Sequence, residues 1–150
     1  VSTSEDHVAP ESEQTLAFGG TVLYIEDNLS NVEFVQEVLS RYPSVQLLVA
    51  MQGRMGLALA EEHRPDLILL DLHLPDMEGS EVLSAIRSNP ALQAMPVIIL
   101  SADATERQVR RLMDLGASAY MTKPFKLAEL IGVLSDVFAN VENAGSSAQL

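Results

Sequence analysis

The sequence predicts an α/β fold in which a doubly wound sheet of five parallel strands carries five helices on its two faces. Short apolar runs, each bounded by polar or turn residues, recur five times along the chain. Segments with the apolar spacing of amphipathic helices follow these runs. Because the runs are mostly apolar, they are typical of strands buried on both faces, which pair in parallel and are joined by helices. Right-handed crossovers then favour a doubly wound sheet.

Two strand–helix pairs are predicted in the first part of the chain. The strands lie over 22–25 and 45–51, where the residues are mostly apolar. After the first strand, four residues are spaced as on one face of a helix: Val35, Val38, Leu39 and Tyr42. After the second strand, a shorter stripe with helical spacing consists of Met55, Ala58 and Leu59.

Three further strand–helix pairs complete the pattern. The remaining apolar runs lie over 67–70, 97–100 and 117–121. A weak helix over 78–88 follows the first of these runs, and it carries Val82, Leu83 and Ile86. A helix that Gly116 ends follows the second, and it carries Val109, Leu112 and Met113. The last helix has the longest apolar face: Leu127, Leu130, Ile131, Leu134, Val137 and Phe138.

The folded domain is predicted over 21–140, with both ends of the chain outside it. Residues 1–20 contain four acidic residues and no Lys or Arg: Glu5, Asp6, Glu11 and Glu13. A segment with so few apolar residues cannot offset the entropy lost on ordering. We therefore expect a disordered acidic tail or linker over 1–20. A flexible C-terminal tail is expected over 141–150, which consists mainly of small and polar residues.

The composition excludes several classes of function. Nine Lys and Arg against 21 Asp and Glu give a formal net charge of −12, which argues against direct binding to nucleic acid or to an anionic membrane. The chain has no cysteine, which excludes disulfides and thiolate chemistry and is compatible with a cytoplasmic location. No apolar run is long enough to insert in a bilayer, and the sequence does not open like a signal peptide. The first residue is Val, which favours a fragment of a longer protein.

Polar side chains follow four of the predicted strands. Glu26 and Asp27 follow the first, Asp71 the third and Ser101 the fourth, while Lys123 comes shortly after the fifth. Because function in doubly wound sheets gathers at the carboxyl ends of the strands, we expect these side chains to converge. Neighbouring carboxylates repel one another, and Mg²⁺ relieves that repulsion through oxygen ligands. With a lysine, a hydroxyl and a free carboxylate nearby, the cluster suits phosphoryl transfer.

Four motifs surround these residues: Tyr24-Ile25-Glu26-Asp27-Asn28, the run DLILLDLHLPDMEG over 66–79, Ser101-Ala102 and Lys123-Pro124-Phe125. In this order and spacing they resemble the receiver domains of two-component response regulators. The resemblance covers about residues 20–140. It implies a flavodoxin-like three-layer sandwich with strand order 2-1-3-4-5. The first motif is also similar to receivers attached to hybrid sensor histidine kinases.

The resemblance implies an acceptor and a metal site. Asp71 matches the aspartate that takes a phosphoryl group from a phosphohistidine on a sensor histidine kinase or a histidine phosphotransfer protein. Glu26 and Asp27 match the acidic pair that binds Mg²⁺, and Asp71 and the backbone carbonyl of His73 complete the protein ligands. Many receivers carry two aspartates at the pair, so Glu26 is a departure from the family pattern.

The resemblance also implies the residues that sense the phosphoryl group. Ser101 matches the hydroxyl residue that turns toward the group, with the small Ala102 beside it. Lys123 matches the lysine that pairs with a phosphoryl oxygen, and its bond to Pro124 is typically cis in the family. Tyr120 matches the aromatic switch residue that moves inward when the hydroxyl moves.

Other interpretations stay open for single residues. Glu26 is alternatively a solvated turn residue, Ser101 a helix cap, and Tyr120 a packing residue. His73 contributes either its backbone or an imidazole base. Two other functions compete: a Mg²⁺-dependent phosphatase with an aspartyl nucleophile, and a receiver-like interaction module that is not phosphorylated. Such phosphatases usually have a second aspartate where this chain has His73.

The densest basic patch consists of Arg107, Arg110 and Arg111. It is either a solvated helix face or part of the output surface, which receivers often form from the fourth helix, fifth strand and fifth helix. A downstream protein partner, a linked domain or a second copy would bind there. Three arginines in so acidic a chain are too few to indicate DNA binding.

Overall fold

Strands and helices alternate along the whole of the chain that the structure describes, residues 19–149 of a computed structural model. Residues 1–18 lie outside it, so the expected acidic tail stays a prediction. The elements in order are β1 (Gly20–Ile25), α2 (Leu29–Leu39), β2 (Val45–Ala50), α3 (Gly53–His63), β3 (Leu67–Asp71), α4 (Gly79–Ser88), β4 (Val97–Ser101), α5 (Glu106–Asp114), β5 (Ala119–Thr122) and α6 (Leu127–Gln149).

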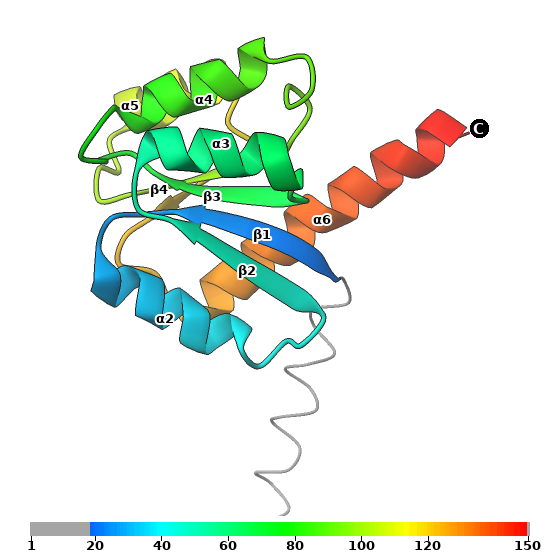
Figure 1. The fold of residues 1–150 in the computed structure, drawn as a ribbon, viewed down its shortest axis with the longest axis horizontal. Helices are drawn as coiled ribbons and strands as arrows, with labels where there is room; N and C mark the ends of the chain where they lie inside the picture. The colour runs from blue at the N-terminus through cyan, green and yellow to red at the C-terminus, as the bar shows by residue number, and fades with distance from the viewer. Residues whose placement is uncertain (1–18, 150) are drawn as a thin grey trace, which may run out of the picture.

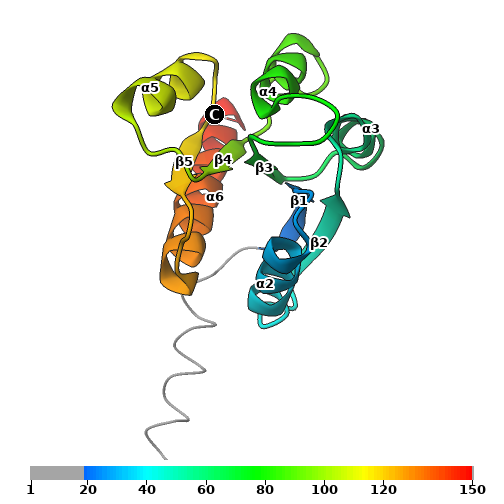
Figure 2. The ribbon, with the colours of Figure 1, turned by 90° about the vertical axis from the view of Figure 1, so that its left-hand side faces the viewer.

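The five strands form one parallel sheet in the order β2-β1-β3-β4-β5. Helices α2 and α6 cover one face of the sheet, and α3, α4 and α5 cover the other (Figures 1 and 2). The predicted fold, a doubly wound sheet between two helical layers, is confirmed.

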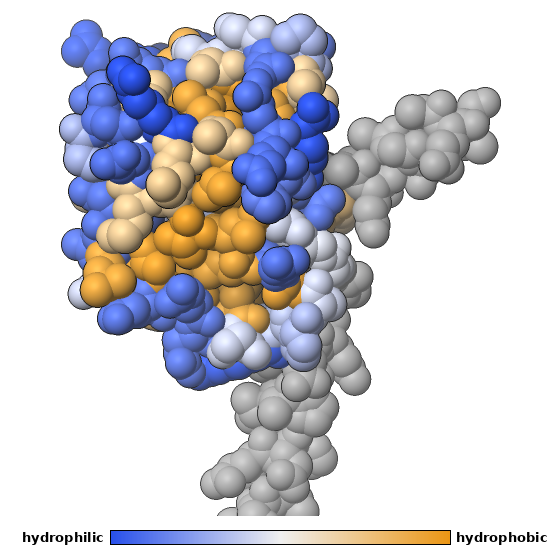
Figure 3. Space-filling model, in the orientation of Figure 1, coloured by the Kyte–Doolittle hydropathy of each residue, from blue (hydrophilic) through white to orange (hydrophobic). Residues whose placement is uncertain are grey.

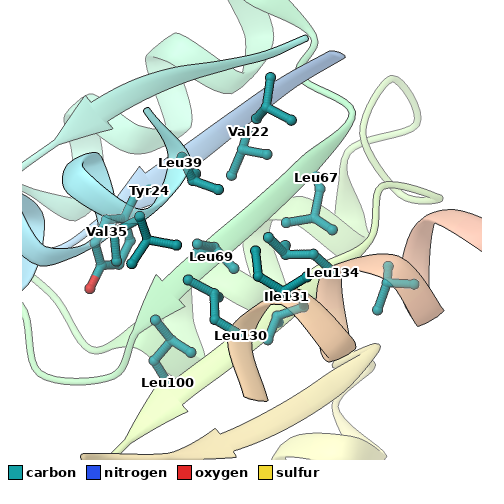
Figure 4. Packing of buried hydrophobic residues seen from close by; sticks show 14 of the residues in the cluster. Val22, Tyr24, Val35, Leu39, Leu67, Leu69, Leu100, Leu130, Ile131 and Leu134 are labelled. Carbon is teal, nitrogen blue, oxygen red and sulfur yellow. The ribbon is translucent and has the colours of Figure 1, made fainter. Parts of the chain in front are cut away.

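The sheet separates two hydrophobic cores because successive residues of a strand point to opposite faces. Along β1, Val22 and Tyr24 pack with the apolar faces of α2 and α6, as Figure 4 shows. Leu23 and Ile25 pack on the other side with α3 and α4. All four side chains are fully buried. The middle strands are therefore held on both faces, which fixes the ends of β1 and β3 where the polar motifs begin.

Side-chain caps set the first turns of two helices near those polar motifs. The Asn28 carboxamide oxygen accepts a hydrogen bond from the Asn31 backbone at 3.0 Å, so α2 begins directly after the acidic pair. Thr105 caps α5 in the same way, accepting from Gln108 N at 3.3 Å. Because Thr105 caps this helix, Ser101 is not needed as its cap.

The last helix is longer than the sequence predicted. Helix α6 runs from Leu127 to Gln149, so the backbone of nearly all of the expected flexible tail over 141–150 is helical (Figure 1). The segment contains no proline, the residue that breaks helices most strongly. Gly145 costs a helix only about 1 kcal/mol, so nothing in the segment ends the helix that the apolar face starts. The domain boundary at 140 stays a prediction.

Strand β2 forms one edge of the sheet. Hydrophobic residues gather on the side of the molecule where this edge lies (Figure 3). Leu47, Leu48 and Val49 in this strand are only partly buried. Among the described residues, no helix combines the length and the apolar character required to cross a membrane.

Candidate functional site

The carboxyl ends of β1, β3, β4 and β5 bring the predicted polar residues to one edge of the sheet. Asp71 is the last residue of β3, and it pairs across the sheet with Leu100, so Ser101 follows at the end of β4. Ser101 in turn pairs with Thr122, the residue before Lys123. The Lys123 backbone N–H donates to the Ser101 carbonyl at 2.7 Å, which fixes where the lysine leaves the sheet.

The ammonium of Lys123 lies between two carboxylates from distant parts of the chain. Its Nζ is 2.7 Å from Glu26 Oε1 and 2.9 Å from Asp71 Oδ1. The Lys123 side chain is 19% exposed, whereas the side chains of Glu26 and Asp71 are 1% and 6% exposed. Both ion pairs are therefore shielded from water, which strengthens the attraction and makes an unpaired partner costly. The Lys123–Pro124 peptide bond is cis, as the resemblance implies.

The buried carboxylate of Glu26 accepts hydrogen bonds from four groups. The Tyr24 hydroxyl donates to Oε1 at 3.0 Å and the Asn31 side-chain amide donates to the same oxygen at 3.2 Å. Lys123 supplies the third donor to Oε1. The second oxygen, Oε2, accepts from Asn28 N at 3.3 Å. Glu26 is thus a buried, hydrogen-bonded group and not a solvated turn residue.

Burial and charge shift the titration of these groups. Desolvation raises the pKa of Asp71 above its usual value, although hydrogen bonding and attraction from Lys123 oppose that rise. Burial opposes the charge of Lys123, but its bonds to Glu26 and Asp71 outweigh burial and raise its pKa. Burial, with the nearby charge of Glu26, raises the pKa of Tyr24, so this residue stays a neutral hydroxyl donor.

Three carboxylates at this edge fit a hard divalent cation. Oxygen atoms of Glu26, Asp27 and Asp71 all lie within 4.8 Å of one another. Glu26 and Asp71 are buried, whereas Asp27 is exposed, so the cluster opens to solvent on the Asp27 side. An all-oxygen donor set with several negative charges is what Mg²⁺ prefers, and one lysine does not balance three carboxylates.

Two hydrogen bonds tie Ser101 and Tyr120 to one residue of the loop between β4 and α5. The Ser101 hydroxyl oxygen accepts from Asp103 N at 3.1 Å. The Tyr120 hydroxyl donates to the Asp103 carbonyl at 2.6 Å. Tyr120 is half-buried and therefore lies at the rim of the site rather than in the interior. The loop after Ser101 is thus attached to both residues that the sequence assigned to sensing the phosphoryl group.

The loop that follows Asp71 is held close to the site by tight backbone contacts. His73 N–H donates to Asp71 Oδ2 at 3.2 Å, and Gly79 N–H donates to the Leu72 carbonyl at 2.8 Å. A Cβ on Gly79 would lie 2.6 Å from Leu72 Cα and 2.7 Å from the Asp71 carbonyl oxygen. Only glycine permits helix α4 to start this close to the end of β3.

A match to the family model described as "Response regulator receiver domain" covers residues 22–135. The chain belongs to this receiver family. The match includes every residue of the cluster described above, from Glu26 to Lys123, and the fold agrees with it.

Relatives of this receiver include proteins from plants and bacteria. The two-component response regulator ORR12 of rice is 34% identical over 59 residues, which cover 39% of this chain and 49% of that protein. The chain thus spans about half the length of the curated relatives it matches first. A receiver domain of the sensor histidine kinase PA1611 from Pseudomonas aeruginosa, solved with magnesium in its active-site cleft, is 29% identical with a TM-score of 0.72. That match covers 79% of this chain and 97% of the other.

A phosphorylated relative has also been solved. The cyanobacterial phytochrome response regulator RcpA, in its phosphorylated form, is 31% identical with a TM-score of 0.67. The match covers 80% of this chain and 91% of RcpA. This receiver therefore resembles structures that carry a metal ion or a phosphoryl group.

The structure brings together Glu26, Asp27, Asp71 and Lys123. Among the described residues, the side-chain hydrogen bond of Ser101 is with Asp103 N and not with this group. The role of the His73 carbonyl stays a prediction. Sequence reasoning missed Tyr24 and Asn31 as residues whose side chains donate hydrogen bonds to Glu26. For Tyr24 a signal existed, because residues two apart in a strand share a face and a buried tyrosine hydroxyl needs a partner.

Proposed function

We propose that Asp71 accepts a phosphoryl group from a phosphohistidine donor in the presence of Mg²⁺. The donor is a sensor histidine kinase or a histidine phosphotransfer protein. The observation that carries the proposal is the 2.9 Å contact between Lys123 Nζ and Asp71 Oδ1. The two residues are 52 positions apart in the chain, and the fold brings a shielded cation next to the carboxylate. A cation there can also pair with an arriving phosphoryl oxygen.

In the transfer, a carboxylate oxygen of Asp71 attacks the phosphorus of phosphohistidine. The P–N bond breaks, the imidazole nitrogen keeps the electron pair and takes a proton from solvent, and Asp71 becomes an acyl phosphate. Lys123 then pairs with one phosphoryl oxygen and the Ser101 hydroxyl donates to another. Positioning and charge neutralisation are the main requirements of phosphoryl transfer.

Mg²⁺ would be held by Glu26, Asp27 and Asp71, with the His73 carbonyl as a further ligand. Bound there, the ion supplies positive charge that stabilises the phosphoryl oxygens during transfer. The oxygen cluster of this chain supports the assignment, and so does the magnesium ion in the cleft of the related Pseudomonas receiver.

The signal leaves the site through the loop between β4 and α5. When the Ser101 hydroxyl turns to the phosphoryl group, its bond with Asp103 N is given up. Tyr120, which holds the Asp103 carbonyl, is then free to move inward. Such new bonds shift the population between two arrangements of the loop and helix. The surface of α5, β5 and α6 changes as a result, and a downstream protein, a linked domain or a second copy binds there.

Incubation with acetyl phosphate and Mg²⁺, followed by intact mass measurement, tests the proposal. We expect the wild-type protein to gain the mass of one phosphoryl group and Asp71→Asn to gain none. Asp114→Asn is the matched control, because Asp114 is exposed at the end of α5. We expect this variant to gain one phosphoryl group, as the wild type does. Equal labelling of Asp71→Asn and wild type would overturn the assignment. Release of phosphate from a small ester by the wild-type protein would favour the phosphatase alternative.

A further inference from the structure

Glu26 differs from its neighbours in the acidic cluster in how its two oxygens are used. Oε1 accepts three hydrogen bonds, from Tyr24, Asn31 and Lys123, at 3.0, 3.2 and 2.7 Å. Oε2 accepts one hydrogen bond among the described residues, from Asn28 N at 3.3 Å. A carboxylate oxygen has two lone pairs, so Oε1 is saturated and Oε2 retains capacity for a further partner.

Two of the three donors to Oε1 come from elements that the packing of the core fixes. Tyr24 is fully buried in β1, within the cluster formed with α2 and α6. Asn31 lies in the first turn of α2, which the Asn28 cap holds in place. Lys123 is the third donor, and it is the only one of the three that also binds Asp71.

The third donor is the one that the phosphoryl group needs. If Lys123 were the sole partner of Glu26, moving its ammonium toward a phosphoryl oxygen would leave a carboxylate that is 1% exposed without a donor. An unpaired buried charge is costly, so Glu26 would retain the lysine. The Tyr24 hydroxyl and the Asn31 amide keep Oε1 occupied whether or not Lys123 stays.

We propose that Tyr24 and Asn31 are positioning residues that hold Oε1 of Glu26, so that Oε2 serves the divalent cation and Lys123 is released to the phosphoryl group. The inference rests on the proposed function, since it assigns a role within the same metal site. It also explains how this receiver uses a longer glutamate in place of the first aspartate of the pair. The glutamate folds back onto Tyr24 and Asn31, and one oxygen is left for the metal.

The test is the affinity for Mg²⁺ itself, measured by titration calorimetry on the metal-free protein. Residues that orient a metal ligand typically contribute 10–100-fold in affinity, so we expect Tyr24→Phe and Asn31→Ala each to weaken Mg²⁺ binding about tenfold. Tyr42→Phe is the matched control, because it removes a hydroxyl from the same core cluster without touching Glu26 and leaves the affinity unchanged.

A double-mutant cycle separates positioning from a general structural effect. In a Glu26→Gln background, we expect Tyr24→Phe to cause no further loss of Mg²⁺ affinity, because the carboxylate that it orients is absent. A loss of equal size in both backgrounds would overturn the inference, and so would unchanged affinity in both single variants. Wild-type protein that binds no Mg²⁺ would instead contradict the proposed function.

Discussion

The carboxylate of Asp76 caps helix α3, although the residue belongs to a loop more than 20 positions later. Its Oδ1 accepts from Gly53 N at 2.8 Å and its Oδ2 from Arg54 N at 2.9 Å. The residue at the N-cap position, Gln52, provides no side-chain cap of its own. The loop after Asp71 is thereby attached to α3, which contacts α4 on the same face of the sheet, and this steadies the segment that carries the His73 carbonyl.

Replacing Asp76 with alanine is expected to lower the midpoint of thermal unfolding at pH 7 by several degrees. Two backbone N–H groups lose their acceptor, and the negative charge leaves the positive end of the helix. The hydrogen bonds from the Arg54 and Gly53 backbones lower the pKa of Asp76. The contribution of the Asp76 carboxylate to stability is therefore complete at pH values above its unfolded pKa. It is lost as the pH falls through the lower pKa of the folded state. The difference in midpoint between variant and wild type should narrow toward pH 3, and a difference independent of pH would contradict the capping role.

Gly79→Ala is expected to lower the free energy of unfolding by about 1–3 kcal/mol, the usual cost of overpacking. The new Cβ meets the backbone of Leu72 and Asp71, which cannot turn aside as a side chain would. Gly132→Ala is the control, since nothing lies within 4 Å of its Cβ and alanine favours the helix by about 1 kcal/mol. Urea unfolding measures both changes. Gly79→Ala as stable as wild type would show that the close approach is not required.

Asp71→Asn is expected to raise the thermal midpoint of the metal-free protein at pH 7. Desolvation raises the folded pKa of Asp71 above its unfolded value, so the folded state binds the proton more tightly. Wild-type stability therefore falls as the pH rises from about 4 through the folded pKa, and the neutral amide escapes this loss. The gain should shrink as the pH falls below the unfolded pKa of Asp71, because the wild-type carboxyl is then protonated in both the folded and the unfolded state. Asp114→Asn, the same substitution at an exposed position of α5, is the control variant.

Lys123→Met is expected to lower the free energy of unfolding at pH 7 by about 3 kcal/mol without metal, because two shielded carboxylates lose their counterion. Saturating Mg²⁺ should recover part of this loss, since the ion supplies the missing positive charge. Lys126→Met is the matched control, as this neighbouring lysine is exposed. Equal stability of the two variants in urea titrations would show that the bridging ammonium contributes nothing to folding.

The sequence was sufficient for the sheet and for most of the cluster. Mostly apolar runs mark strands buried on both faces. At their carboxyl ends the observed strands differ from the predicted bounds by no more than one residue, and Asp71 is added to β3 and Ser101 to β4. Because parallel strands end at one edge, the convergence of Glu26, Asp71 and Lys123 follows from topology.

What the sequence could not provide depends on loop paths and on side-chain direction. The contact of Asp76 with Gly53 requires the course of two loops that no periodicity describes. The bond from Asn31 to Glu26 requires the exact turn between β1 and α2. The continuation of α6 to Gln149 was missed for another reason, since composition suggested a tail where no strong helix breaker is present.

The division of the interior by the sheet has a consequence for multiple substitutions. Tyr24 and Ile25 are adjacent in the chain, yet they belong to separate packing compartments on either side of β1. A change of volume at one position is accommodated by α2 and α6, and at the other by α3 and α4. Energetic effects at such sequence neighbours should be nearly additive, whereas Tyr24 and Leu134, 110 positions apart in one compartment, should be coupled. In this molecule, the face of the sheet on which two side chains lie, rather than their distance along the chain, decides whether their substitutions are energetically coupled.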